Sequence, residues 1–151
     1  MVTPRVLSAN WRTSWNGWCT DARFRNMERR FETRPCVLCC SPTAEDRIEH
    51  YARCPRVVAF AGRCLGFSAA SCSLQAFLLC ERGWSNEQLA ARAVLVYAVF
   101  RCMHRLRDYE NPSETYVYDL LEQYAKLGVQ GHGPSANIIF GAGRWRAMRL
   151  R

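Results

Sequence analysis

Four residues with metal-binding side chains lie close together between positions 36 and 54. Cys36, Cys39, His50 and Cys54 follow the pattern Cys-x2-Cys-x10-His-x3-Cys. Thiolates and a neutral imidazole are the ligands of structural zinc sites, and four of them leave no coordination position for water. The spacing therefore predicts a closed Zn²⁺ site that stabilises structure and performs no catalysis.

The second ligand has an alternative, because Cys40 follows Cys39 directly. With Cys40 the pattern becomes Cys-x3-Cys-x9-His-x3-Cys. We favour Cys39, since a two-residue spacer lets the intervening amides donate hydrogen bonds to the thiolates. The alternative to a metal site is a set of buried thiols beside a surface histidine. The concentration of ligand types in one short stretch, flanked by turn-forming residues, argues against that interpretation.

Short helices are expected to position these ligands. His50 and Cys54 are four residues apart, so on a helix capped by Thr43 they would lie on one face and point at one metal ion. Pro55 is suited to the first position of a following helix. Further helical patterns cover residues 21–32, 57–65, 73–82, 84–109 and 111–127, and Ser85 with Gln88 forms a capping box.

These patterns predict a mainly α fold: a small helical domain with a Cys-Cys-His-Cys zinc module and a flexible basic C-terminal tail. We divide the sequence into a basic, Trp-rich helical lead-in, a zinc-binding module, a helical domain, and a Gly-rich linker with the basic tail. These parts cover residues 1–35, 36–56, 57–127 and 128–151. Trp11, Trp15 and Trp18 would share one helical face in the lead-in, where they either pack into the core or stack on nucleic-acid bases.

The chain is strongly basic and its cations are almost all arginine. The net charge is +8, and Lys126 is the single lysine. Arginine suits bidentate phosphate contacts and stacking on bases, so we expect a nucleic-acid partner, RNA or DNA, bound mainly through its phosphate backbone. The expected contact residues are Arg23, Arg25, Arg29, Arg30, Arg34, Tyr51, Arg53, Arg56, Arg144, Arg146, Arg149 and Arg151.

Other classes of protein are disfavoured. Nine cysteines without a signal peptide favour an intracellular protein of the nucleus or cytoplasm over a secreted one. The longest apolar run, 93–100, is too short to span a membrane. We find no phosphate-binding loop, nucleophile elbow or paired catalytic carboxylates, so we expect neither an enzyme nor a small-molecule substrate.

The stretch CVLCCSPTAEDRIEHYARCPRV resembles the zinc-binding segment downstream of the reverse transcriptase domain in LINE-type (non-LTR) retrotransposon proteins. The similarity covers residues 11–66 and includes the upstream Trp15–Thr20 lead-in. Three residues separate His50 from Cys54, where family members commonly have four. The resemblance implies a module that holds template RNA or target DNA and lacks the polymerase catalytic site.

Two other interpretations stay open at this point. The chain is alternatively a zinc-stapled protein-interaction module, with a partner bound on the helix over 85–107, or a decayed retroelement remnant without function. Two measurements, nucleic-acid binding and the oligomeric state, distinguish the protein-interaction module from a nucleic-acid-binding module.

Overall fold

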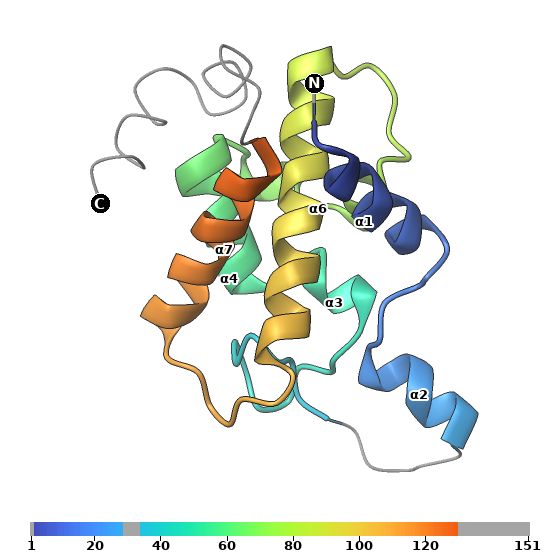
Figure 1. Ribbon diagram of the computed structural model, residues 1–151, viewed down its shortest axis with the longest axis vertical. Coiled ribbons are helices and arrows are strands. Elements are labelled where there is room, and N and C mark those ends of the chain that lie inside the picture. The colour runs from blue at the N-terminus through green and yellow to red at the C-terminus, as the bar shows by residue number, and fades with distance from the viewer. Residues whose placement is uncertain (1, 29–33, 130–151) are drawn as a thin grey trace.

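The computed structural model describes residues 2–28 and 34–129 (Figure 1). These residues are mainly helical, as predicted, and the β-structure among them is a single antiparallel bridge between Pro35 and Glu45. Apart from its first two residues, the predicted tail lies outside the described ranges. The elements in order are α1 (Pro4–Ser14), α2 (Asp21–Glu28), α3 (Ile48–Tyr51), α4 (Pro55–Phe60), the π-helical turn η1 (Ala61–Leu65), the 3-10 turn η2 (Ala69–Ser71), α5 (Leu74–Phe77), α6 (Asn86–Leu106) and α7 (Glu114–Val129).

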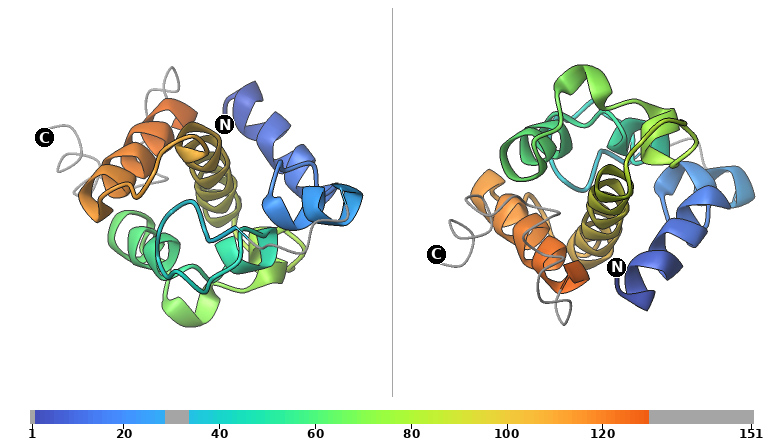
Figure 2. Two further views of the ribbon diagram at one scale, coloured as in Figure 1. Left: turned by 90° about the horizontal axis from the view of Figure 1, so that it is seen from below. Right: turned by 90° about the horizontal axis from the view of Figure 1, so that it is seen from above.

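Helix α6 is the centre of the fold. All its residues from 91 to 100 are buried, as expected for a helix that is packed on every side. Helices α1 and α7 lie against it on opposite sides, and α4 and α5 lie on a third side (Figure 2). The predicted capping box is confirmed: the Ser85 hydroxyl accepts from the Gln88 amide at 3.2 Å, and the Gln88 side chain accepts from the Ser85 amide at 2.9 Å.

The burial of α6 changes the interpretation of its apolar stripe. This helix was predicted to offer a partner surface over 85–107. In the structure its apolar residues from Ala91 onward are buried against the rest of the chain, so of its large apolar side chains only Leu89 in the first turn is exposed. What α6 exposes is its first turn and, towards its C-terminus, Arg101 and Arg105.

The predicted tryptophan stripe is divided, because α1 ends at Ser14. The Asn16 amide donates to the Thr13 carbonyl at 3.0 Å and the Gly17 amide to the Arg12 carbonyl, with Asn16 in the left-handed region (φ 50°). This paired bonding is a Schellman helix end. A Cβ on Gly17 would lie 2.9 Å from the Arg12 oxygen, so the close approach requires glycine. Trp11 and Trp15 are therefore exposed on α1, whereas Trp18 lies beyond the turn and is buried.

Helix α7 begins and ends later than predicted. Asn111 and Pro112 were expected to start it, but the helix begins at Glu114, with the Ser113 hydroxyl accepting from the Tyr116 amide at 3.2 Å. Gly128, expected to follow the helix, lies inside it. A Cβ there would come within 3.2 Å of both the Val6 and the Tyr97 side chains, so the glycine allows α1 and α6 to approach α7.

One hydrophobic core joins most of the described segments. It includes Val6 of α1, Cys36 and Cys54 of the metal-binding region, the middle of α6 and Val129 of α7. None of the nine cysteines forms a disulfide. No helix in the described ranges combines the length and apolarity needed to cross a bilayer. The metal-binding region is thus part of the main core and not an appendage to it.

Trp18 connects the metal-binding region to α6. It is fully buried, and its ring lies 5.7 Å from the Tyr51 ring, 5.7 Å from Phe77 and 5.5 Å from Phe100, measured between centroids. Its indole N–H donates to the Thr13 hydroxyl at 2.7 Å, which satisfies the single polar group of the buried ring.

Candidate metal centre

The chain reverses direction between Cys36 and Cys40. The Cys39 amide donates to the Cys36 carbonyl at 2.8 Å, and Cys39 adopts a left-handed backbone with φ 51°. Leu38, at the tip of the turn, is fully buried, and its carbonyl accepts a hydrogen bond from the Arg56 guanidinium. The Cys36 amide donates to the Ala44 carbonyl at 2.6 Å, so the turn is anchored at its base and its tip.

The second thiol of the site belongs to Cys40, and the prediction of Cys39 is wrong. The Sγ atoms of Cys36, Cys40 and Cys54 and a ring nitrogen of His50 all lie within 4.8 Å of one another. Cys40 Sγ is 3.0 Å from His50 Nε2. Cys39 Sγ instead lies 3.9 Å from the Val37 carbonyl and is outside the group. The left-handed conformation of Cys39 turns the next residue back over Cys36, which brings the Cys40 thiol to the site.

His50 and Cys54 also meet by a different route from the one predicted. The expected helix over 43–54 is reduced to the four residues of α3, which ends at Tyr51. Cys54 lies beyond it, at the N-cap position of α4, with Pro55 as the first residue of that helix. The two ligands therefore come from the end of one helix and the start of the next, and they do not share a helical face. The prediction that Pro55 begins α4 is confirmed.

Buried hydrogen bonds hold the loop that precedes α3. Asp46 accepts from the Asp21 amide at 2.8 Å and from the Tyr51 hydroxyl. Burial raises the pKa of Asp46, and the two donors oppose that shift. Burial also raises the pKa of Tyr51, so its hydroxyl stays a neutral donor. Tyr51 is fully buried, which overturns its predicted role in stacking on a base.

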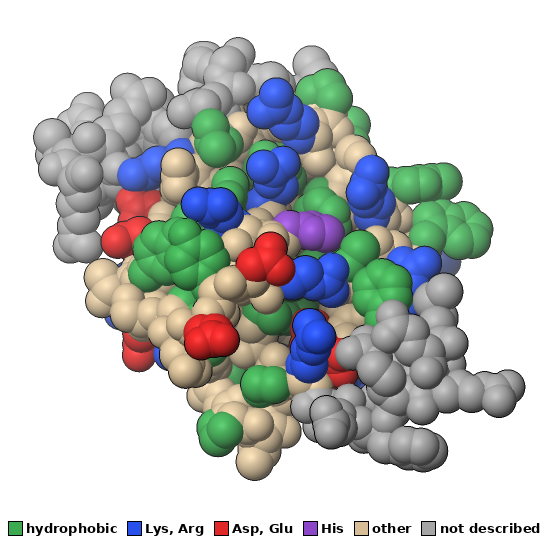
Figure 3. All heavy atoms as spheres, turned by 60° about the horizontal axis from the view of Figure 1, so that its bottom comes forward, with side chains coloured by type: hydrophobic (Ala, Val, Ile, Leu, Met, Phe, Trp, Pro, Cys, Tyr) green, Lys and Arg blue, Asp and Glu red, His purple; other side chains and the backbone are tan. Residues whose placement is uncertain are grey.

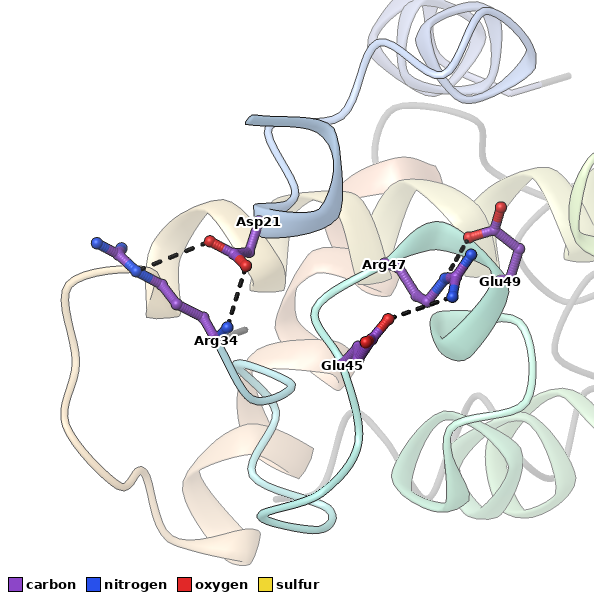
Figure 4. A network of polar contacts seen from close by, with 5 residues as sticks. All are labelled: Asp21, Arg34, Glu45, Arg47 and Glu49. Carbon is purple, nitrogen blue, oxygen red and sulfur yellow. Dashed lines mark hydrogen bonds and ion pairs between the residues drawn. The ribbon is translucent and has the colours of Figure 1, made fainter. Parts of the chain in front are cut away.

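Ion pairs on the surface of the same loop reinforce this arrangement (Figure 4). Arg47 lies between two carboxylates, with nitrogen–oxygen distances of 3.2 Å to Glu45 and 3.1 Å to Glu49. Asp21 accepts from the Arg34 amide at 3.0 Å, and its other oxygen lies 3.9 Å from the Arg34 Nε. The two Arg47 pairs are exposed and contribute little to stability individually, whereas the Asp21 carboxylate is buried; together these contacts fix the loop geometry.

The three thiols of the group perturb one another strongly. A hydrogen bond from the Cys36 thiol lowers the pKa of Cys54 to about 4, and the His50 ring with the amides of Val57 and Arg56 acts in the same direction. The Cys36–Cys54 hydrogen bond, together with burial, raises the pKa of Cys36. Burial, followed by the neighbouring Cys54 charge, raises the pKa of Cys40 to about 11. Three sulfurs this close cannot all ionise unless a cation offsets their repulsion.

The group fits a tetrahedral metal ion. With metal–sulfur distances of about 2.3 Å, the edges of such a tetrahedron are about 3.8 Å long, so the widest pair of atoms needs to close by about 1 Å and the Cys40–His50 pair, at 3.0 Å, needs to open slightly. Cys36 and Cys54 are buried, and Cys40 and His50 are partly exposed. All four positions of a tetrahedral ion are then filled by protein, which leaves none for a substrate or a reactive water.

Comparisons with family models, with curated proteins and with solved structures find no match to this chain. The resemblance of its metal-binding stretch to a retroelement segment therefore stays a prediction. What the chain does has to be inferred from its own residues and contacts.

The predicted nucleic-acid contacts that the structure describes are partly engaged within the chain. Arg23 donates to the Asn16 carbonyl at 2.9 Å, Arg34 pairs with Asp21, and Arg56 donates to the metal-binding turn. Arg53 is exposed. The remaining predicted contacts lie outside the described residues: Arg29, Arg30, Arg144, Arg146, Arg149, Arg151 and the side chain of Arg25.

Three arginines that were not among the predicted contacts come together on another face. Arg12 of α1 and Arg101 and Arg105 of α6 line one surface hollow. The spacing of Arg101 and Arg105, four residues apart and off the apolar stripe of α6, was a usable signal for two of them. Their proximity to Arg12 depends on the packing of α1 against α6, which sequence patterns do not reveal.

Proposed function

We propose that Cys36, Cys40, His50 and Cys54 hold a structural Zn²⁺ ion. Three sulfurs and one imidazole form the soft, tetrahedral ligand set that closed zinc sites use. Metal analysis of the purified chain is expected to give about one zinc per chain, and a chelator is expected to lower its melting temperature. A metal-free chain whose melting curve ignores the chelator would rule the zinc site out.

We further propose that this zinc-stabilised helical module binds nucleic acid, mainly through phosphates. The observation that supports this is the group formed by Arg12, Arg101 and Arg105. None of the three pairs with a carboxylate in the described part of the chain. Cations gathered on one face without compensating carboxylates attract a polyanion, and their binding to its phosphates releases the counterions condensed on the nucleic acid.

A retroelement origin is a further part of this proposal. The sequence from Trp15 to Thr20 and the Cys54-Pro55 junction support it, together with the acidic residue and histidine of α3. The thiol at Cys40 weakens it, because a three-residue spacer departs from the Cys-x2-Cys turn on which the resemblance rests.

A salt titration tests nucleic-acid binding. The zinc-loaded chain is mixed with fluorescently labelled single-stranded RNA, single-stranded DNA or duplex DNA, and anisotropy is followed as the salt concentration rises. Three phosphate contacts to a single strand predict a slope of log K against log salt of about −2. Weak binding that does not respond to salt would contradict the proposal.

A further inference from the structure

Two tryptophans are exposed side by side on α1. Trp11 is 68% exposed and Trp15 is 70% exposed, and their ring centroids are 5.8 Å apart with the planes tilted by 53°. A tilted pair leaves an outer face of each ring open. Large exposed aromatic rings are uncommon on the surface of a soluble chain, and a contiguous pair marks an interaction site.

The packing of α1 fixes the direction in which this pair faces. Val6, Ala9 and Thr13 form the buried side of the helix, and the Asn10 amide donates to the Ala93 carbonyl of α6 at 3.0 Å. At 100° per residue, Trp11 and Trp15 lie roughly opposite that buried side. Arg12 lies between the two sides, and α1 has no acidic residue. The aromatic pair thus continues into a basic edge of the same helix.

That basic edge borders a hollow of about 370 Å³ between α1, α6 and α7. Arg12, Arg101 and Arg105 line it together with Phe100, His104 and Tyr124, and no carboxylate takes part. Arg101 lies over the Tyr124 ring at 5.4 Å, and His104 contacts the Phe100 ring at 4.4 Å, so aromatic rings hold these side chains in place. Figure 3 shows a face on which a histidine lies among basic side chains, with an acidic side chain also beside it and apolar side chains at the edge.

The electrostatic field in the hollow is positive. Burial lowers the pKa of His104, and the charges of Arg107, Arg101 and Arg12 lower it further. A neutral histidine in such a field can still donate one hydrogen bond, and the hollow offers guanidinium groups from two helices. This combination suits a phosphate group better than an acidic peptide, because guanidinium groups match the oxygens of a phosphate bidentately.

We propose that a single-stranded nucleic acid binds across this face, with successive phosphates against Arg12, Arg101 and Arg105 in the hollow and bases stacked on Trp11 and Trp15. This inference rests on the proposed nucleic-acid binding and names its surface. A single strand is required because the bases of a duplex are already stacked and cannot cover an indole ring. Aromatic platforms beside a basic groove bind single strands without sequence preference.

Matched variants of the zinc-loaded full chain test the surface. Trp11→Leu with Trp15→Leu keeps the apolar character and removes the aromatic faces, whereas Trp11→Phe with Trp15→Phe keeps both. Leu7→Ala is the control, since Leu7 is 60% exposed on the same side of α1 but cannot stack. The leucine variant is expected to bind a labelled single-stranded oligonucleotide about ten-fold more weakly or worse, and the phenylalanine variant and the control close to wild type.

A second pair of variants tests the contacts of Arg101 and Arg105 with phosphates. Arg101→Gln with Arg105→Gln is expected to reduce the salt slope on single-stranded DNA by about 1.4, the contribution of two phosphates. Arg63→Gln with Arg82→Gln is the control for a general loss of charge, because both side chains are exposed, neither lines the hollow and neither is among the expected contacts. This control is expected to change the slope by less than half as much.

The outcomes separate this surface from nucleic-acid binding as such. If wild type binds with a salt slope but the leucine variant and the Arg101/Arg105 variant bind equally well, nucleic-acid binding stands and this surface is wrong. If wild type binds no oligonucleotide, both proposals fall. If the wild-type chain self-associates through the tryptophans and the leucine variant retains oligonucleotide binding, the face is a protein contact and the inference is overturned.

Discussion

Neighbouring cysteines in the turn at 36–40 give a sharp test of the metal site. We expect Cys40→Ser to impair metal binding and Cys39→Ser to leave it nearly unchanged. The reason is geometric: Cys40 Sγ lies 3.0 Å from His50 Nε2, whereas the Cys39 thiol lies 3.9 Å from the Val37 carbonyl and outside the ligand group. The two variants carry the same chemical change at adjacent positions, so each is the control for the other.

The expected size of the effect follows from the number of ligands. Structural zinc sites in small domains bind the ion with a free energy of about 10–16 kcal/mol, which is about 2.5–4 kcal/mol for each of four ligands. A serine hydroxyl is a much poorer zinc ligand than a thiolate, so most of that share is lost at Cys40. At 1.4 kcal/mol per factor of ten, the affinity is expected to fall by about two to three orders of magnitude.

Competition for zinc against a chromophoric chelator measures this affinity directly. Cobalt substitution adds a second readout, because the intensity of the thiolate-to-metal absorption reports how many sulfurs bind the ion. Cys40 is not a ligand if Cys39→Ser weakens zinc binding as much as Cys40→Ser does, or if Cys40→Ser retains a three-thiolate cobalt spectrum.

Other predictions concern the core and its pH dependence. Trp18→Ala is expected to lower the free energy of unfolding of the zinc-loaded chain in urea by about 3–5 kcal/mol, because its ring is buried. Trp15→Ala is expected to lower it by at most about 0.5 kcal/mol, because that ring is exposed. Equal losses would contradict the division of the tryptophan stripe. Tyr51→Phe is expected to cost about 1–3 kcal/mol by removing a donor to buried Asp46, and an unchanged unfolding midpoint would contradict that bond. His104 has a folded pKa below its ordinary 6.5, so the unfolded chain binds more protons and stability is expected to fall as the pH drops through that range. His104→Gln should flatten this pH dependence relative to wild type at saturating zinc, and identical pH profiles would count against it.

Local signals in the sequence predicted parts of the fold well. The capping box at Ser85 and Gln88 and the long apolar stripe after it located α6 to within a few residues. Pro55 correctly marked the start of α4. These signals succeed because each depends on residues within one or two helical turns, and no distant contact opposes them.

The errors have a common physical cause in the turns. Trp11, Trp15 and Trp18 have helical spacing, but the bonds at Asn16 and Gly17 end the helix between them. The helical spacing of the tryptophans does not reveal this turn. The turn depends on Gly17, which lies so close to the Arg12 carbonyl that there is no space for a Cβ. Cys39 is a similar case, because its left-handed backbone directs the following thiol to the metal site. The basic hollow escaped prediction since Arg12 and Arg101 meet through packing of α1 on α6.

With the proposed zinc bound, the position of Cys36 and Cys54 within the main core would link the amount of folded protein to the supply of metal. Because these side chains pack in the same cluster as the middle of α6, losing the ion exposes core surface and not just a loop. By mass action the folded population rises with the logarithm of the free metal concentration above its dissociation constant. In a zinc-poor environment more of the chain would be unfolded and open to proteases. Its abundance would then follow the zinc supply, even though the ion contacts no nucleic acid or other binding partner.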